Sequence, residues 1–94
     1  MDKQNQMDII KVAATSNVNS VAGSIALGCT SDTGIYVQAI GANSVNQAVK
    51  AIATARGYLA PKNQDLNVRI SYVELKLREG TKTAMRFELQ LVEK

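Results

Sequence analysis

Hydrophobic and polar positions follow two different periods along this chain, and together they predict six elements of secondary structure. Alternating runs at 8–15, 35–40, 66–78 and 83–92 predict four strands. Apolar residues at helical spacing predict two helices, over 18–29 and 45–60. The predicted order is therefore β-α-β-α-β-β. Because crossovers between parallel strands are right-handed, we expect a two-layer α/β sandwich, with both helices on one face of a four-stranded mixed sheet.

The second predicted helix has the clearest boundary signals. Gly41 precedes it and is expected in a tight turn at positive φ, where glycine has no Cβ to clash. Ser44 and Gln47 have the S-x-x-Q spacing of a capping box, which predicts a helix that starts at Val45. Pro61 predicts its end, because the residue before a proline is pushed out of the helical region.

Other local signals refine the remaining elements. The first strand is apolar on both faces, which predicts an interior strand. Asn17 is expected to cap the first helix. The apolar phase of the third strand changes between Tyr72 and Val73, which predicts a β-bulge there. A hairpin turn is expected at 79–81, with Gly80 at positive φ.

Composition narrows the class of protein. The chain has 94 residues, 46% of them hydrophobic but only 4% aromatic, which predicts one small domain over 8–94 with an aliphatic core. Residues 1–7 are polar and are expected to be a disordered N-terminus. No apolar run approaches the roughly 18–20 residues of a membrane span, and no signal-peptide pattern is present. We therefore expect a cytoplasmic protein without a membrane partner.

The residue types present favour binding over catalysis. The chain has no histidine, which is the commonest general base and metal ligand. Its acidic residues lack the spacing of a calcium loop. We expect no metal, no cofactor, no catalytic residue and no enzyme activity. Cys29, the one cysteine, is expected to be a small buried hydrophobe.

Four blocks of sequence carry a family resemblance. They are IKV at 10–12, SNVNSVAGSIA at 16–26, QAIGA at 38–42 and NQAVKAIATARGYLAP at 46–61. With them the chain resembles the stage V sporulation protein S family, small bacterial proteins of the Alba-like superfamily, from about residue 8 to residue 93. The resemblance implies an Alba-like fold, a cytoplasmic homodimer and a regulatory role in development such as sporulation.

The resemblance also implies a nucleic-acid partner, because Alba-like proteins in general bind DNA or RNA. In Alba itself, lysines after the first strand and arginines on the hairpin make much of that contact. The hairpin here carries the candidate phosphate-binding residues Lys76, Arg78, Lys82 and Arg86. The loop at 15–20 departs from the Alba pattern, since it has no basic residue. We therefore expect sequence-independent binding of modest affinity. The alternative is a hairpin kept soluble by mixed charges, since three glutamates lie among the basic residues.

Further residues are candidates for anion or partner contacts. Ser16, Asn17, Asn19 and Ser20 precede a helix N-terminus, which can hold an anion, although capping alone explains Asn17.

On the second helix the candidates are Lys50 and Arg56. Arg56 falls within the apolar stripe, where we expect its guanidinium to cap the last carbonyls or meet a carboxylate, with an anion or partner contact as the alternative. Tyr36 and Tyr72 are candidates to stack nucleic-acid bases on the open sheet face, with core or dimer packing as the alternative.

Two functions follow from these patterns. The first is a dimeric nucleic-acid-binding regulator that contacts the phosphate backbone through the hairpin. The second is a dimeric protein-interaction module in a regulatory pathway, which uses the first helix and the polar loop and binds no nucleic acid. In both cases we expect a homodimer. The two helices carry more apolar surface than a two-layer monomer of this size can bury, and a second copy would bury part of it.

Overall fold

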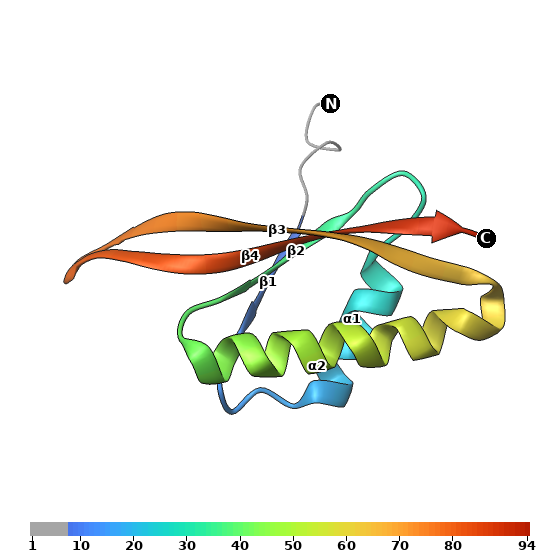
Figure 1. Cartoon of the computed structure of the whole chain (residues 1–94), viewed down its shortest axis with the longest axis horizontal. Helices are drawn as coiled ribbons and strands as arrows, with labels where there is room; N and C mark the ends of the chain where they lie inside the picture. Colours follow the sequence, from blue (N-terminus) through green and yellow to red (C-terminus); the bar gives the residue numbers. More distant parts are fainter. Residues whose placement is uncertain (1–7) are drawn as a thin grey trace.

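Two helices cover one face of a four-stranded mixed sheet in the computed structural model, which describes residues 8–94 (Figure 1). The elements are β1 (Asp8–Val12), α1 (Val18–Gly28), β2 (Ile35–Ala39), α2 (Ala42–Leu59), the short 3-10 helix η2 (Ala60–Lys62), β3 (Gln64–Leu77) and β4 (Gly80–Glu93). The strand order is β1-β2-β4-β3, with only β1 and β2 parallel. The predicted β-α-β-α-β-β sandwich is confirmed. The predicted disordered segment at 1–7 lies outside the described residues.

The core lies between the helices and the sheet face that they cover. Pairing places Ile35 opposite Leu89 and Val37 opposite Phe87, and all four side chains are buried on that face. The helices contribute mainly alanines to the core, and such small side chains allow close approach between helices and sheet. The alternate residues of the strands lie on the other face, called the open face here.

Local signals set one helix start correctly and misplace the other. Asn17 caps α1 as predicted, since its Oδ1 accepts a hydrogen bond of 2.9 Å from the backbone N–H of Ser20. The capping box is wrong. Gly41, at a φ of 90°, is the N-cap of α2, and Ser44 lies inside the first turn. Gln47 instead donates from Nε2 to the Ser16 carbonyl at 2.8 Å, which ties α2 to the loop before α1.

The first strand is an edge strand, so the prediction of an interior strand is wrong. It is also shorter than predicted, because the chain turns after Val12, where Ser16 Oγ accepts from the Ala13 N–H at 2.8 Å. Ile10 packs against the core, but Ile9 on the open face is 44% exposed. Ile9 is therefore a surface residue, and its apolar side chain does not indicate that the open face of β1 is buried.

The hairpin contains no bulge, so that prediction is also wrong. β3 and β4 pair in one unbroken register, from Gln64 opposite Glu93 to Leu77 opposite Gly80. The apolar phase changes because the two halves of β3 bury residues on opposite faces. Leu66 packs under α2, whereas Leu75 lies on the open face in the part that extends past β2. Gly80 has the expected positive φ, at 129°.

Candidate nucleic-acid interface

Residues 73–84 form a two-stranded arm that extends beyond the rest of the sheet (Figure 1). β2 pairs with β4 only over 85–89, so the arm has no third strand beside it. A turn of two residues, Arg78 and Glu79, makes the tip. Most arm side chains are exposed, the exceptions being Val73, Leu75 and Ala84. A two-stranded ribbon of this kind fits the major groove of DNA.

The four basic hairpin residues are spread over both faces and the tip of the hairpin instead of lining one face. Strand alternation puts Lys76 on the same face as the helices and Lys82 and Arg86 on the open face, with Arg78 at the tip. Lys76, Arg78 and Lys82 are exposed. The ion pairs among residues 8–94 are those of Asp65 with Arg56 and Lys94. No carboxylate in this range therefore neutralises the arm cations through an ion pair.

Arg86 lies at the root of the arm and is half-buried. Its Nε and Nη2 donate to Gln38 Oε1 at 3.1 and 2.6 Å. Its guanidinium carbon lies 4.9 Å from the centre of the Tyr36 ring, which is a cation–π geometry. Tyr36 is thus on the open face as a base-stacking platform requires. Tyr72 is on the opposite face and is 77% exposed.

Sequence reasoning missed two basic residues of the open face, Lys11 and Arg69. Lys11 pairs across to Gln38, which in turn pairs with Arg86, so the three residues form one row across the sheet. Arg69 lies opposite Glu88 in the neighbouring row. From the sequence, the alternation of side chains shows only which residues of one strand share a face. The row depends on the strand order and register, which no local pattern contains.

The polar residues around the start of α1 serve mainly local structure. Ser16 and Asn17 precede the helix, whereas Asn19 and Ser20 lie in its first turn and not in a loop ahead of it. Ser16 Oγ and Asn17 Oδ1 accept the turn and capping hydrogen bonds, and the Ser20 N–H is the donor to the cap. Asn19 is exposed. This arrangement supports the capping interpretation of Asn17.

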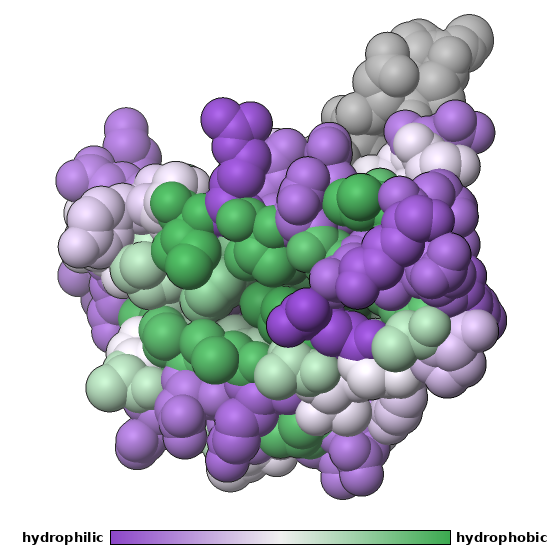
Figure 2. All heavy atoms as spheres, turned by 45° about the vertical axis from the view of Figure 1, so that its right-hand side comes forward, coloured by the Kyte–Doolittle hydropathy of each residue, from purple (hydrophilic) through white to green (hydrophobic). Residues whose placement is uncertain are grey.

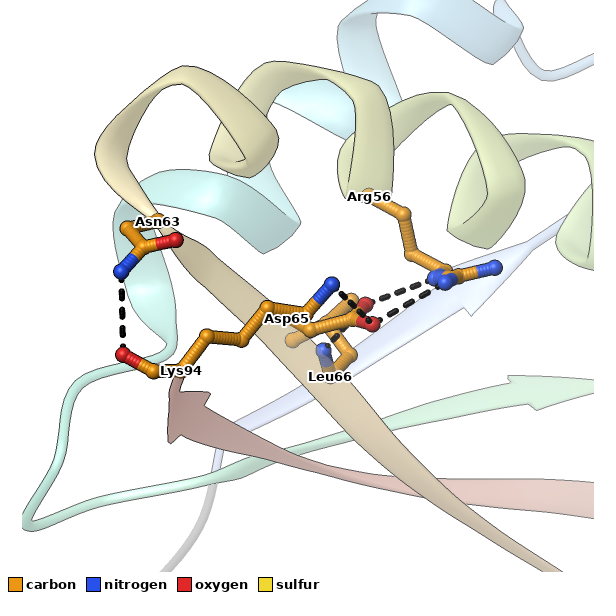
Figure 3. A network of polar contacts seen from close by, with 5 residues as sticks. All are labelled: Arg56, Asn63, Asp65, Leu66 and Lys94. Carbon is orange, nitrogen blue, oxygen red and sulfur yellow. Dashed lines mark hydrogen bonds and ion pairs between the residues drawn. The ribbon is translucent and has the colours of Figure 1, made fainter.

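Arg56 meets a carboxylate, as one of its predicted alternatives required (Figure 3). Its Nε and Nη2 donate to the two Asp65 oxygens at 2.7 and 3.0 Å, and the Leu66 N–H donates to Asp65 Oδ1 at 2.8 Å. Lys94 Nζ lies 3.7 Å from Asp65 Oδ2. The contact joins the last turn of α2 to the start of β3. Lys50, the other candidate on this helix, is exposed.

This network shifts the pKa values of both partners. The Arg56 hydrogen bonds, followed by that of the Leu66 N–H, hold the pKa of the Asp65 carboxyl well below its usual range. The same contact raises the pKa of Arg56. Burial raises the pKa of the Cys29 thiol, whose Sγ donates to the Leu89 carbonyl at 3.6 Å. Cys29 is therefore a buried core residue, as predicted.

Replacing Asp65 with asparagine is expected to lower the Tm by a few degrees at pH 7. A depressed folded pKa adds stability that is present above the unfolded pKa of about 3.9 and is lost as the pH falls through the folded value. The wild-type Tm should therefore fall more steeply than that of Asp65→Asn below about pH 4. Thermal unfolding followed by circular dichroism from pH 7 to pH 2 measures both effects.

The matched control is Asp32→Asn, which changes an exposed carboxyl in the turn before β2. It should leave the Tm at pH 7 unchanged. Equal Tm values for Asp65→Asn and wild type at pH 7 would show that the network adds nothing to stability.

No group of three or more histidine, cysteine, aspartate or glutamate residues gathers within the described part of the chain in a way that could hold a metal ion. Neither helix of residues 8–94 combines the length and the hydropathy needed to cross a membrane.

Comparison with known proteins places the chain in a family and relates its fold to a solved structure. The model for the family Stage V sporulation protein S (SpoVS) matches residues 8–92, which confirms the resemblance found in the sequence. The solved structure of Alba from Thermoplasma volcanium matches with a TM-score of 0.60 over 92% of this chain and 100% of that chain. The sequence identity is 17%, so the likeness to that structure concerns the fold alone.

Proposed function

We propose that this chain, which belongs to the Stage V sporulation protein S family, is a small cytoplasmic nucleic-acid-binding regulatory protein that contacts the phosphate backbone through the β3–β4 hairpin. It acts as one Alba-like domain over residues 8–94, without cofactor or catalysis. The observation that carries the proposal is the exposed arm, with Arg78 at its tip and Lys76 and Lys82 beside it.

The charge of the arm accounts for the kind of binding proposed. A lysine or arginine that contacts a phosphate releases condensed counterions, so affinity falls with rising salt. Cations that surround a narrow ribbon can meet phosphates on both sides of a groove. Phosphates carry no sequence information, and neither helix presents a row of arginines or asparagines for reading bases. DNA or RNA of any sequence is therefore the proposed partner.

The open face extends this cationic surface from the arm onto the sheet. Lys11 and Arg86 lie in one row, and Tyr36 packs beside Arg86. Tyr36 offers an aromatic platform that tolerates any base. The arm is thus the proposed site of phosphate contact, and the open face beside its root is the proposed path along which the strand continues.

We also propose that the protein works as a homodimer formed through the outer side of β3 and α2. β3 is an edge strand, and its helix-side residues Val68, Ile70 and Tyr72 are exposed, as is Val49 of α2. Figure 2 shows hydrophobic residues gathered in a band across one face, with hydrophilic residues above and below it. A second copy would cover both the apolar stripe and the unpaired edge, which otherwise invites aggregation.

Removing two arm cations is expected to weaken binding to every sequence alike. Arg78→Ala with Lys82→Ala should reduce the steepness of log K against log salt by about one unit for each phosphate that the variant no longer binds. Fluorescence anisotropy with labelled DNA and RNA at several salt concentrations measures both the affinity and the slope.

The matched control is Lys50→Ala with Lys62→Ala, which removes the same charge from exposed positions on α2 and η2. If the arm binds the phosphates, the control retains most of the wild-type slope. If the control weakens binding as much as the arm variant does, binding depends on net charge and not on the arm.

A protein-interaction module is the second candidate. The observation that favours it is Leu27, which is 85% exposed on α1. In that case the arm serves solubility, and α1 with its preceding loop binds a protein partner. The two candidates differ in whether the purified chain binds nucleic acid at all.

A further inference from the structure

An open pocket of about 310 Å³ lies at the carboxyl ends of the parallel strands β1 and β2, beside the root of the arm, and Lys11 at its edge also lies on the proposed path of the nucleic-acid strand. Its walls are mainly aliphatic, with Val12 and Ile40 at the strand ends and Leu75 and Leu77 from the arm. Small-molecule sites range from roughly 300 to 1,000 Å³. Open α/β sheets bind ligands beyond the carboxyl ends of their strands. The size and the place both fit a small ligand.

The polar side chains at this pocket offer donors and positive charge. Lys11 lines it, and none of the lining residues is acidic. Within residues 8–94 no carboxylate forms an ion pair with Lys11. The first turn of α2 adds the positive end of a helix dipole, because Ser44 lines the pocket and that turn has no acidic residue and no side-chain cap.

Gln38 adds a hydrogen-bond donor, its Nε2 group, and the contact of its Oε1 with Arg86 fixes the orientation of the amide. Its side chain lines the pocket, and the residue is only 6% exposed. A guanidinium can only donate, so the two hydrogen bonds from Arg86 require the amide oxygen to face Arg86. The Nε2 end must then face away from Arg86, and among residues 8–94 it has no hydrogen-bond acceptor. An amide nitrogen in a pocket wall that lacks an acceptor is a favourable place for a ligand oxygen.

We propose that this pocket binds a small carboxylate with a compact aliphatic body. The carboxylate would accept from the Lys11 ammonium and Gln38 Nε2, and the aliphatic body would lie against Leu75, Leu77 and Ile40. A cationic ligand would meet Lys11 without any acidic partner. A nucleobase would find no aromatic ring for stacking, because no lining residue is aromatic.

Such a ligand would join the arm to the body of the domain. Leu75 and Leu77 belong to β3, at its arm end, whereas Lys11 and Gln38 belong to β1 and β2. The arm otherwise has no strand beside it, so a ligand bound in the pocket would add contacts between the arm and the rest of the domain. Binding at the pocket is therefore a means of setting the position of the arm.

The test is a titration of the ¹⁵N-labelled full chain with hexanoate, followed by NMR chemical shifts of the backbone amides. We expect saturable shifts at the pocket residues, with a Kd on the order of 1 mM or tighter. Lys11→Met should weaken binding about tenfold, because it removes one charge-assisted hydrogen bond to the carboxylate. Gln38→Glu should abolish binding, because a second carboxylate then faces the ligand while Arg86 keeps an acceptor.

Three controls distinguish binding in this pocket from non-specific binding of an anion or of an aliphatic chain elsewhere on the protein. Lys62→Met, which removes a charge from an exposed position on η2 away from the pocket, should bind hexanoate as wild type does. Hexanol tests the need for the anion, and inorganic phosphate tests the need for the aliphatic body; both should bind at least about tenfold more weakly. Hexanol binding as tightly as hexanoate, or no saturable shift at tens of millimolar hexanoate, would overturn the proposal. Neither result depends on nucleic acid.

Discussion

Replacing Ile70 with glutamate is expected to reduce the mass of the particle in solution from twice to once the 10.1 kDa of the chain. Ile70 is 59% exposed and lies between Val68 and Tyr72 in the stripe on β3. In a dimer through this face, the glutamate would lose its water without gaining a partner, which costs several kcal/mol. A penalty of that size weakens association by a factor on the order of a thousand. Light scattering coupled to size-exclusion chromatography measures the mass directly.

Ile9→Glu is the matched control, because it makes the same chemical change at another exposed isoleucine, on the open face of β1. It should leave the mass at two chains. A wild-type mass of one chain at tens of micromolar protein would contradict the dimer. An unchanged mass for Ile70→Glu would move the interface to another face.

The largest decrease in stability is expected from Phe87→Ala. Phe87 is 3% exposed and is the aromatic residue of the buried core. Truncating a buried phenylalanine costs about 3–5 kcal/mol, because the ring is no longer packed against its neighbours and a cavity remains. Domains of this size have about 5–15 kcal/mol in total, so the variant should be close to unfolding. Urea unfolding at one fixed protein concentration measures the change.

Tyr58→Ala is the control for this variant, since Tyr58 is an aromatic residue 45% exposed on α2. Its decrease in stability should stay below about 1 kcal/mol. A comparable decrease for both variants would mean that the core does not depend on the packing of Phe87.

The element order could be predicted because each element carries its own period. The Asn17 cap and the positive φ of Gly41 and Gly80 were also predicted correctly.

Pro61 did not act as predicted, because Ala60 before it keeps helical angles, with a φ of −56° and a ψ of −43°. The failures arose where a local pattern had two explanations. Ser44 and Gln47 fit a capping box, but the glycine before them begins the helix three residues earlier.

The strand errors have a different cause, which is that burial depends on neighbours distant in sequence. The phase change after Tyr72 looks like a slipped register, yet the unbroken ladder shows that the arm buries residues on the other face. Ile9 looks like an interior residue, but β1 lies at the edge.

Only part of the candidate site could be named from the sequence, since Lys11 and Arg69 of the open face were missed and the geometry of the site could not be predicted. The basic hairpin positions could be identified from the sequence, but the distribution of Lys76 and Lys82 over two faces follows from the register.

The sequence could indicate that Arg56 meets a carboxylate, but it could not indicate which one. Asp65 is the partner because η2 turns the chain so that the start of β3 lies beside the last turn of α2. The pocket beside Gln38 combines two strands, a helix start and the arm, so no local signal indicates it.

The central claim is nucleic-acid binding, and the most direct measurement is wild-type affinity for unrelated DNA and RNA sequences as a function of salt. We predict a Kd on the order of micromolar at physiological salt, nearly equal for all sequences. The slope of log K against log salt should be about −0.9 for each phosphate contacted on duplex DNA, and three arm cations predict a slope steeper than about −2. If no salt-dependent binding to DNA or RNA occurs at hundreds of micromolar protein, the nucleic-acid proposal is wrong and the chain acts through proteins instead.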